Sequence, residues 1–292
     1  IKIKIKDINV FCLFFLLYLF MKNLKGKIAV VTGAGSGMGR CMTLQLLEKG
    51  AIVIATDKNS ETLNETKSMA PKGEIHVFTV DAAKENEINA FAKKVIKQFG
   101  YIDILINNAG FALGKIALKD VKMEDFKLLM DVNVWGVINH TKAFIDVLLE
   151  RPEASIVNIS SLFGITGLSE QVPYCTTKFA VRGFSESLRM EMIGSNVVVT
   201  CVHPGGIKTN IAKNSINYGQ EELLEKFEKN LLRIPAEEAA RQIIQSIQKK
   251  QERLLIGIEV EIADRIVRSF PVKYSGIIKT VYDKMLNAKL KS

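Results

Sequence analysis

The sequence KIAVVTGAGSGMG, residues 27–39, contains a short apolar run, a glycine-rich turn and the start of a helical pattern. Glycine suits such a turn because the backbone must bend tightly there and approach a ligand closely. The helix that follows offers free N–H groups and the positive end of its dipole, which favour a phosphate. We therefore predict a strand, a phosphate-binding turn and a helix. The predicted binding residues of the turn are Gly33, Gly35, Ser36, Gly37, Met38 and Gly39.

Short apolar runs alternate with amphipathic segments from this turn to residue 257. Strands that are apolar throughout are typical of a parallel sheet with both faces covered, and strand–helix alternation implies right-handed crossovers. We predict an α/β fold: a single doubly wound Rossmann domain with a seven-stranded parallel sheet flanked by helices on both faces. The predicted strands are 28–32, 52–56, 75–80, 103–107, 155–160, 197–202 and 253–257. The predicted helices lie near 38–49, 60–69, 84–99, 123–149, 173–193 and 236–250.

The chain divides into three predicted parts. Residues 1–24 form an apolar and basic N-terminal extension, residues 25–260 the catalytic Rossmann domain, and residues 261–292 a basic helical C-terminal extension. Within the domain, residues 204–235 are expected to form a lid, because a long connection in such a fold is usually functional. The C-terminal part alternates apolar and basic residues, a pattern that fits a membrane surface or a partner subunit.

The N-terminal extension contains an unbroken apolar run, VFCLFFLLYLFM, residues 10–21. A membrane-spanning helix needs about 20 such residues, and this run is shorter. Its basic flank resembles that of a signal peptide, but no small-residue cleavage site follows. Three interpretations stay open: an extension that is absent from the native protein, a membrane anchor, or a cleaved signal. We expect a cytoplasmic protein, which becomes membrane-associated if residues 1–20 are genuine.

The formal net charge of +9 is concentrated at the two ends of the chain. Residues 1–27 carry six lysines and one aspartate, and residues 265–292 carry seven basic residues and one aspartate, which leaves the body with a charge of −2. A nucleic-acid-binding domain is expected to carry a basic face on its folded body. We therefore predict no nucleic-acid partner and interpret the basic ends as solvated segments or as contacts to a membrane surface.

Cysteine and histidine are sparse and scattered along the chain. The four cysteines and three histidines include no CxxC pair and no metal-ligand spacing, so we predict no metal site. Unpaired cysteines in a chain of this size are typical of a reducing compartment. The hydrophobic content of 48% is enough to form a core without disulfides or metals.

Asp57 ends the second predicted strand, 20 positions after Gly37. A carboxylate at this place can bind the 2′-hydroxyl of a nucleotide ribose and repels a 2′-phosphate. We therefore predict NAD as the cofactor, with NADP as the less favoured alternative. Lys58 and Arg40 weaken this preference if they offer positive charge to a phosphate. In the competing interpretation, Asp57 only caps the turn that follows it.

Together with motifs further along the chain, these features resemble the short-chain dehydrogenase/reductase family over about residues 25–257. Thr32, Gly33, Gly37 and Gly39 match the family pattern TGxxxGxG, and the motif NNAG occurs at 107–110. The resemblance implies an oxidoreductase that binds a nicotinamide dinucleotide. It implies further cofactor contacts from Asp81, Ala82, Asn108, Ala109, Gly110, Tyr174, Lys178, Pro204, Gly205, Ile207 and Thr209.

The most specific part of the resemblance is Ser161, followed 13 positions later by Tyr174 and then by Lys178. It implies that Tyr174 is the general acid and base, that Ser161 binds the substrate oxygen, and that Lys178 also holds the nicotinamide ribose. Asn133 occupies the position of the family's asparagine, which implies that it holds a water in a proton relay. The catalytic residues so implied are Asn133, Ser161, Tyr174 and Lys178.

The spacing of Tyr174 and Lys178 agrees with such a role. Residues four apart lie on one face of a helix, so the two side chains are neighbours. A phenol has an ordinary pKa of about 10, and we expect the nearby ammonium to lower the pKa of Tyr174. Taken singly, the tyrosine could instead be a packed aromatic, the lysine a solvated charge and Ser161 a helix cap. Asn133 could be a polar residue that bends a helix.

The residues that follow the fourth, fifth and sixth predicted strands are mostly apolar, so we predict a hydrophobic secondary alcohol or ketone as substrate. Two alternatives remain: a catalytically silent dinucleotide-binding regulatory or scaffold protein, and a membrane-attached dehydrogenase of lipids, steroids or retinoids. The resemblance implies a homodimer or homotetramer through the helices at 123–149 and 173–193. The residues expected to face the substrate are Phe111, Leu113, Phe163, Ile165, Leu168, Val172 and Ile211.

Overall fold

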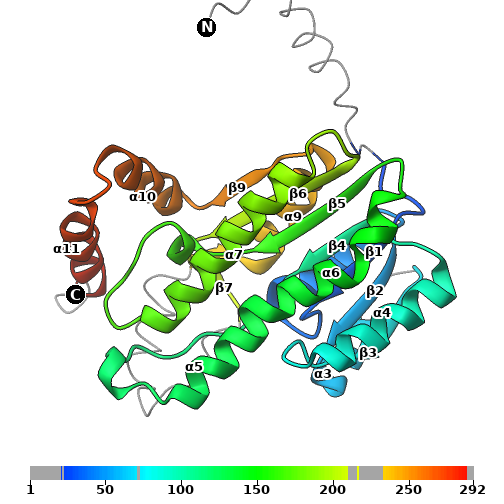
Figure 1. Ribbon diagram of the computed structural model, residues 1–292, viewed down its shortest axis with the longest axis horizontal. Coiled ribbons are helices and arrows are strands. Elements are labelled where there is room, and N and C mark those ends of the chain that lie inside the picture. Colours follow the sequence, from blue (N-terminus) through cyan, green and yellow to red (C-terminus); the bar gives the residue numbers. More distant parts are fainter. Residues whose placement is uncertain (1–20, 22, 71–72, 210–215, 217–232, 288–292) are drawn as a thin grey trace, which may run out of the picture.

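A seven-stranded parallel sheet forms the centre of the molecule, in the strand order β3-β2-β1-β4-β5-β6-β9 (Figure 1). The computed structural model describes residues 21, 23–70, 73–209, 216 and 233–287. The seven strands are β1 Ile28–Thr32, β2 Ile52–Asp57, β3 Ile75–Thr79, β4 Ile104–Asn107, β5 Ala154–Ile159, β6 Val197–Pro204 and β9 Arg253–Ile256. The predicted fold class is confirmed, and each predicted strand is present.

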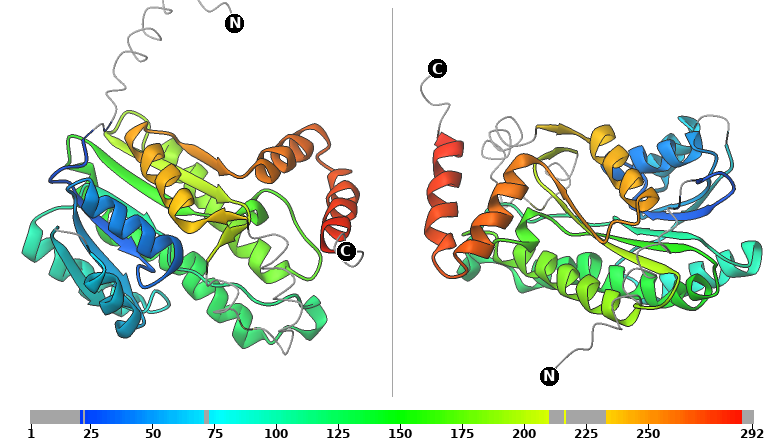
Figure 2. Two further views of the ribbon diagram at one scale, coloured as in Figure 1. Left: turned by 180° about the vertical axis from the view of Figure 1, so that it is seen from behind. Right: turned by 90° about the horizontal axis from the view of Figure 1, so that it is seen from above.

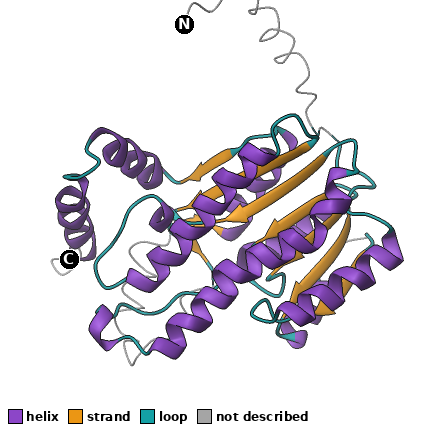
Figure 3. Cartoon of the chain, viewed as in Figure 1, coloured by secondary structure: helices purple, strands orange, loops and turns teal. Residues whose placement is uncertain are grey.

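Helices cover both faces of the sheet, which gives three layers (Figures 2 and 3). On one face, the core joins the sheet to α2 Gly37–Glu48, α3 Ser60–Ser68 and α9 Ala236–Gln248. On the other face, it joins the sheet to α4 Glu85–Phe99, α6 Gly136–Leu149 and α7 Val172–Glu191. The two layers of helices explain why the strands read as apolar runs without polar alternation.

Strand β1 illustrates how the sheet separates the two cores. Ala29 and Val31 belong to the cluster under α2 and α9, whereas Ile28 and Val30 belong to the cluster under α4 and α6. Successive side chains of a strand point to opposite faces, and here both faces are buried. Each apolar residue of β1 therefore removes its surface from water.

The order in which successive strands are added to the sheet changes direction between β1 and β4. The chain builds β2 and β3 on one side of β1, then returns to place β4 on the other side, where Val30 pairs with Leu105. In open α/β sheets, ligands bind outside the carboxyl ends of the strands at such a switch point. The glycine-rich turn after β1 and the NNAG segment after β4 both lie at this edge.

The helix predicted at 123–149 is interrupted. A π-helical turn, η3 Asp131–Trp135, separates α5 Met123–Met130 from α6. Such turns inside α-helices occur frequently at functional sites. Two short 3₁₀ helices, η2 Leu118–Asp120 and η4 Leu162–Gly164, follow β4 and β5. None of these three local features follows from hydrophobic periodicity.

The predicted lid lies mostly outside the described residues, but its two ends pair with each other. Strands β7 Ile207–Lys208 and β8 Ile234–Pro235 form a small parallel sheet, which the sequence did not predict. Beyond β9, α10 Ile258–Ser269 begins before the predicted limit of the domain at residue 260, and α11 Tyr274–Asn287 follows it.

The N-terminal extension, residues 1–20, lies outside the described residues. Met21 and Leu24, which we assigned to this extension, are buried in the core under α2 and α9. The packed domain therefore includes residues before the predicted boundary at residue 24. Among the residues that the structure describes, no helix is both long enough and apolar enough to cross a membrane.

Asp103 ties the start of β1 to the segment before β5. Its carboxylate, 1% exposed, accepts hydrogen bonds from Ile28 N at 2.9 Å and from Arg151 Nε at 3.0 Å. Lys27 Nζ lies 3.6 Å from the same carboxylate, and the Arg151 guanidinium stacks 3.6 Å from the centre of the Tyr101 ring. This buried carboxylate is thus satisfied by one backbone donor and two cations.

We expect Asp103→Ala to lower the free energy of unfolding by roughly 2–4 kcal/mol, because it leaves a buried N–H and a half-buried guanidinium without their acceptor. Urea unfolding followed by circular dichroism measures the change. Asp146→Ala, on the exposed side of α6, is the control and should change stability by less than about 0.5 kcal/mol. Equal effects of the two variants would contradict this account of Asp103.

Candidate active site

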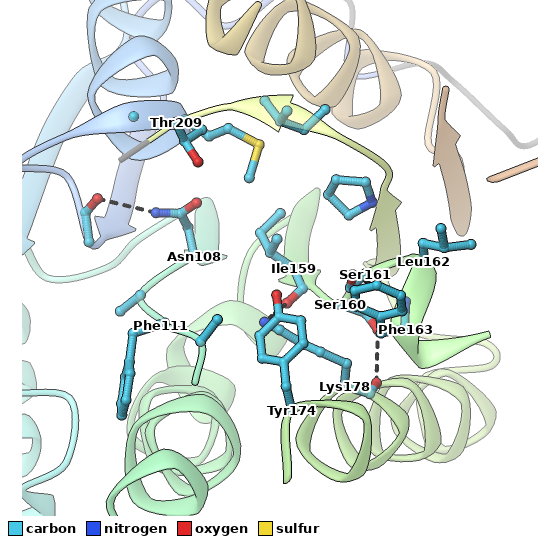
Figure 4. Close-up of a pocket in the computed structure, with 18 of the residues that line it drawn as sticks. Asn108, Phe111, Ile159, Ser160, Ser161, Leu162, Phe163, Tyr174, Lys178 and Thr209 are labelled. Carbon is cyan, nitrogen blue, oxygen red and sulfur yellow. Dashed lines mark hydrogen bonds between the residues drawn. The ribbon is translucent and has the colours of Figure 1, made fainter. Parts of the chain in front are cut away.

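One cavity of about 980 Å³ runs along the carboxyl edge of the sheet (Figure 4). It extends from the end of β2 at Asp57, past the glycine-rich turn, to Ser161 and Tyr174. All but three of the predicted site residues line it. The exceptions are Gly35, Gly39 and Asn133.

The glycine-rich turn is packed so closely that side chains are excluded from it. A Cβ on Gly39 would collide with Gly33 O, and a Cβ on Gly33 would lie 2.8 Å from Ala109 Cα. Gly33 and Gly37 also have positive φ values of 65° and 52°, which favour glycine. The turn is therefore shaped by contact with the loop after β4.

The turn fits the pyrophosphate of a dinucleotide. Ser36 is the N-cap of α2, and its side chain caps no backbone group of the helix. The first N–H groups of α2 and the positive end of its dipole thus face a cradle without side chains, formed by Gly33 and Gly37. Thr209 closes the cradle, since a Cβ on Gly37 would lie 3.2 Å from Thr209 Cβ.

Asp57 is held at the nucleotide end of the cavity by backbone donors. Its Oδ2 accepts from Gly35 N at 2.9 Å, and its Oδ1 accepts from Asn59 N at 3.0 Å. A carboxylate has further acceptor sites on both oxygens. Asp57 therefore both braces the glycine turn and presents a negative charge to a ligand.

Arg40, which we considered as a binding residue for a 2′-phosphate, is engaged elsewhere. Its guanidinium donates to Glu65 Oε2 at 2.8 Å and to Thr66 Oγ1 at 2.9 Å, and it also contacts Gly35 O. Its positive charge is compensated by Glu65. The sequence could not reveal this pairing, because the two residues come from different helices.

Residues after β3 and β4 complete the nucleotide side. Asp81 Oδ1 accepts from Ala83 N at 3.0 Å, which fixes the turn that carries Ala82 against Gly136 of α6. Asn108 Nδ2 donates to Thr32 O at 2.9 Å, so the NNAG segment is tied to the end of β1. Asp81, Ala82, Asn108, Ala109 and Gly110 all line the cavity, as predicted.

Ser161, Tyr174 and Lys178 converge on the middle of the cavity (Figure 4). Tyr174 and Lys178 both project from α7, and Ser161 follows β5. Lys178 Nζ donates to Ile159 O at 3.1 Å and lies 5.5 Å from the centre of the Tyr174 ring. The Tyr174 ring packs edge-on against Phe163, with 6.1 Å between ring centres. The fold therefore brings together the three residues that the family resemblance singled out.

The expected direction of the Tyr174 pKa was wrong. Burial raises the pKa of Tyr174 above its ordinary value, and a hydrogen bond with the Ser161 side chain opposes this only in part. Burial also lowers the pKa of Lys178 to about 8. Desolvation disfavours the charged form of each group, and this effect exceeds the attraction that we expected between them.

Asn133 lies in the π-helical turn η3, and its side chain is already bonded. Its Oδ1 accepts from Phe111 N at 3.0 Å, and its Nδ2 donates to Phe111 O at 2.9 Å and to Thr177 Oγ1 at 3.2 Å. The side chain thus ties the loop after β4 to α7. One acceptor site of Oδ1 remains, and the role of Asn133 in a proton relay stays a prediction.

His203, near the end of β6, is hydrogen-bonded to the main chain of Ser161. Its Nδ1 lies 3.0 Å from Ser161 O, so Nδ1 carries the proton, because a carbonyl only accepts. Its Nε2 can then accept from the Cys201 thiol at 3.4 Å. Burial lowers the pKa of His203 to about 4, so the ring stays neutral at physiological pH. This contact was not predicted from the sequence.

The end of β6 and the residues that follow it form another part of the cavity wall. Pro204, Gly205 and Ile207 line the cavity with Thr209. Gly205 N donates to Ile256 O at 2.8 Å, and a Cβ on Gly205 would collide with Glu259 Oε1. These contacts hold the backbone of the segment against β9 and the start of α10.

The substrate side of the cavity is apolar, and part of it was missed. Phe111, Leu113, Phe163 and Leu168 line it as predicted, but Ile165 and Val172 do not, and Ile211 lies outside the described residues. The far wall comes from α10 and α11, where we did not predict substrate contacts. The missed residues are Ile258, Ile262, Ala263, Ile266, Ile278 and Val281. The four-residue spacing of isoleucine in α10 was the available signal.

Comparison with known proteins gives consistent results. The family model for short chain dehydrogenases matches residues 27–218. The chain is 38% identical over 266 residues to a putative oxidoreductase, SadH, of Mycobacterium tuberculosis, covering 88% of this chain and 96% of that protein.

Two solved structures are similar in fold. A short chain dehydrogenase/reductase from Burkholderia phymatum in complex with NAD superposes with a TM-score of 0.77 at 22% identity, covering 85% of this chain and 94% of that one. The closed form of a serine dehydrogenase complexed with NADP+ gives a TM-score of 0.72 at 29% identity, with coverages of 78% and 94%. The two neighbours bind different nicotinamide cofactors.

We expect Gly35→Ala to weaken dinucleotide binding by about tenfold or more, because overpacking typically costs about 1–3 kcal/mol. The new Cβ would collide with Thr62 Oγ1 and lie 2.9 Å from Asp57 Oδ2. Quenching or enhancement of NADH fluorescence gives the dissociation constant. Gly183→Ala, on the exposed side of α7 with nothing within 4 Å of the new Cβ, should leave binding unchanged. Wild-type affinity in Gly35→Ala would refute the assignment of the turn.

Proposed function

Since this chain belongs to the short-chain dehydrogenase family of nicotinamide-dependent oxidoreductases, we propose that it transfers a hydride between NAD and a hydrophobic secondary alcohol or ketone. Tyr174 acts as the general acid and base of this reaction. The observation that carries the proposal is the convergence of Ser161, Tyr174 and Lys178 on one cavity with the glycine cradle.

A bound nicotinamide supplies the hydride for reduction or accepts it in oxidation, and the protein handles the proton. In reduction, the substrate C=O becomes CH–OH: the carbon gains the hydride and the oxygen gains the Tyr174 proton. The raised pKa of Tyr174 keeps its hydroxyl protonated at neutral pH, so it is ready to donate. In oxidation, Tyr174 first gives up its own proton to solvent, and the phenolate oxygen, stabilised by Lys178, then takes the proton of the alcohol.

Ser161 and Lys178 stabilise the charges that change during this transfer. The Ser161 hydroxyl can donate to the substrate oxygen as negative charge develops on it. The Lys178 ammonium lies near the Tyr174 ring and stabilises the phenolate that remains after proton donation. One Lys178 N–H is fixed on Ile159 O, which leaves two donors for a cofactor ribose. Asn133 helps to position Tyr174 and Lys178, because its side chain fixes the loop of Phe111 against α7, the helix that carries both residues.

NAD is favoured over NADP by the charges at the end of β2. Asp57 directs a carboxylate into the nucleotide end of the cavity, where a 2′-phosphate would be repelled. The positive charge of Arg40, which would favour a phosphate, is compensated by Glu65. Lys58 also lines this end of the cavity, but the negative charge of the adjacent Asp57 offsets its positive charge.

Oligomerisation through α5, α6 and α7 is also part of the proposal. Several large apolar side chains on these helices and on the turn between α5 and α6 are more than a third exposed and do not line the cavity, among them Met123, Trp135, Leu149, Phe179 and Met190. A second copy of the chain would remove this surface from water.

We expect Tyr174→Phe to lower turnover by roughly 10²- to 10⁴-fold, because a positioned general acid or base contributes about that much. Cofactor affinity should stay within about twofold, since the ring still packs on Phe163. Steady-state absorbance of the reduced nicotinamide, with ketones as substrates, measures turnover. Tyr101→Phe, which keeps the ring that stacks on Arg151, is the control and should remain fully active. Full activity in Tyr174→Phe would refute the mechanism.

We expect Asp57→Asn to reduce the preference for NAD over NADP, measured as the ratio of kcat/KM values, by about tenfold to hundredfold. The variant removes the charge but keeps an oxygen acceptor, and hydrogen bonds to charged groups are worth about 1.5–3 kcal/mol. Asp120→Asn is exposed and does not line the cavity, so its ratio should equal that of the wild type. An unchanged ratio in Asp57→Asn would show that another residue selects the cofactor.

A further inference from the structure

Five apolar residues at the far end of the cavity have no role in the reaction proposed above. They come from the two helices that follow the last strand, α10 and α11, which stand together at the edge of the molecule (Figures 1 and 2). Three isoleucines of α10 are four residues apart, so they share one face of the helix. We call Ile258, Ile262, Ile266, Ile278 and Val281 the α10–α11 stripe.

The fold fixes the orientation of α10. Val260 and Ala263 are buried, and Asp264 accepts two hydrogen bonds from Arg253 of β9, at 3.0 and 2.5 Å. Glu259 Oε1 accepts from Gly206 N at 3.1 Å, which connects α10 to the segment after β6. These contacts place the stripe on the cavity, although three of its members keep much of their surface exposed: Ile258 66%, Ile262 49% and Val281 47%.

The stripe and the reacting groups border the same cavity. Phe111, Leu113, Phe163 and Leu168 line the part around Tyr174, so apolar side chains form much of the substrate side of the cavity, whose lining also includes Thr166 and Gln171. A molecule that places its oxygen at Ser161 and Tyr174 therefore lies in the same cavity as the apolar side chains of α10 and α11.

The charged groups on this side of the cavity are already engaged. Lys115 Nζ lies 2.8 Å from Glu170 Oε2, and Glu259 is bonded to Gly206 N. Arg233 also has a partner within the protein. The other charged lining residues are Lys178, at the reacting centre, and Asp57, Lys58 and Asp81, at the nucleotide end. The surroundings of the stripe thus suit an uncharged apolar group.

We propose that the α10–α11 stripe binds an aliphatic chain of the substrate, so that the enzyme acts on long-chain ketones and secondary alcohols in preference to short ones. The proposal rests on the proposed function for the reacting end of the substrate. Burying apolar surface is favourable roughly in proportion to its area, and each fully buried methylene strengthens binding by about threefold to fourfold. Chain length should therefore control binding.

Two ketones that differ only in chain length, 2-pentanone and 2-undecanone, test the proposal with the reduced cofactor. We expect a kcat/KM at least about tenfold higher for 2-undecanone. Ile262→Asn and Val281→Asn should each lower kcat/KM for 2-undecanone by about tenfold more than kcat/KM for 2-pentanone. Both positions are exposed, so the substitutions leave the core intact. Parallel changes for the two ketones, or no change for either, would overturn the proposal.

Binding without turnover separates this proposal from the proposed function. With the oxidised cofactor bound, a ketone cannot be reduced, and calorimetric titration with 2-undecanone reports binding alone. We expect binding to the wild type and a dissociation constant about tenfold higher in Ile262→Asn. If this pattern holds while no ketone is reduced in the kinetic assay, the proposed function fails and the chain-binding role stands. Absence of binding to the wild type overturns the chain-binding role.

Val272→Asn is the matched control. Val272 lies between α10 and α11, is 83% exposed and does not line the cavity, so this variant should match the wild type with both ketones. Light scattering after gel filtration gives the mass of each variant in solution. A lower mass for Ile262→Asn and Val281→Asn would show that a second copy of the chain covers the stripe, and it would overturn the proposal.

Discussion

Thr32 joins the two halves of the sheet at the point where the chain changes direction, and the candidate site depends on this junction. Its Oγ1 accepts from Asn108 N and from Ala109 N, each at 2.9 Å, while its main-chain oxygen accepts from the Asn108 side chain. The loop after β4 is thereby held so close to the turn after β1 that only glycine fits at Gly33 and Gly39. The same closeness creates the cradle at the start of α2. A phosphate site therefore results from the packing of two loops rather than from a glycine-rich segment alone.

Burial governs the chemistry at the centre of the cavity. Tyr174 and Lys178 are both removed from water, so the pKa of the phenol rises and that of the ammonium falls to about 8, a value at which Lys178 is still mostly protonated at neutral pH. A protonated phenol is suited to give its proton to a carbonyl oxygen, and the cation beside it then stabilises the anion that is left. The buried support from His203 and Asn133, which hold Ser161 and the loop of Phe111, keeps these groups in place without adding charge.

The two ends of the cavity differ in the kind of group that they can recognise. The nucleotide end presents backbone N–H groups, the carboxylate of Asp57 and the start of a helix, all of which select by charge and hydrogen bonding. The other end is formed by helices added after the last strand and presents aliphatic side chains. Anchoring of α10 through Asp264 and Arg253 explains how a surface helix can contribute a defined wall to a binding site.

Periodicity in the sequence predicted the seven strands and their alternation with helices, and the resemblance to a known family pointed to Ser161, Tyr174 and Lys178 as the proposed reacting residues. Strands covered on both faces must be apolar throughout, and residues four apart must share a helix face, so these features can be read locally. Only the tertiary structure decided the pairing of Arg40 with Glu65, the small sheet of β7 and β8, and the direction of the Tyr174 pKa. It also decided that the isoleucines of α10 face a cavity. An apolar helix face has the same sequence pattern whether it contacts a core, a membrane or a ligand. Each of these depends on contacts between segments far apart in the chain, which no local pattern encodes.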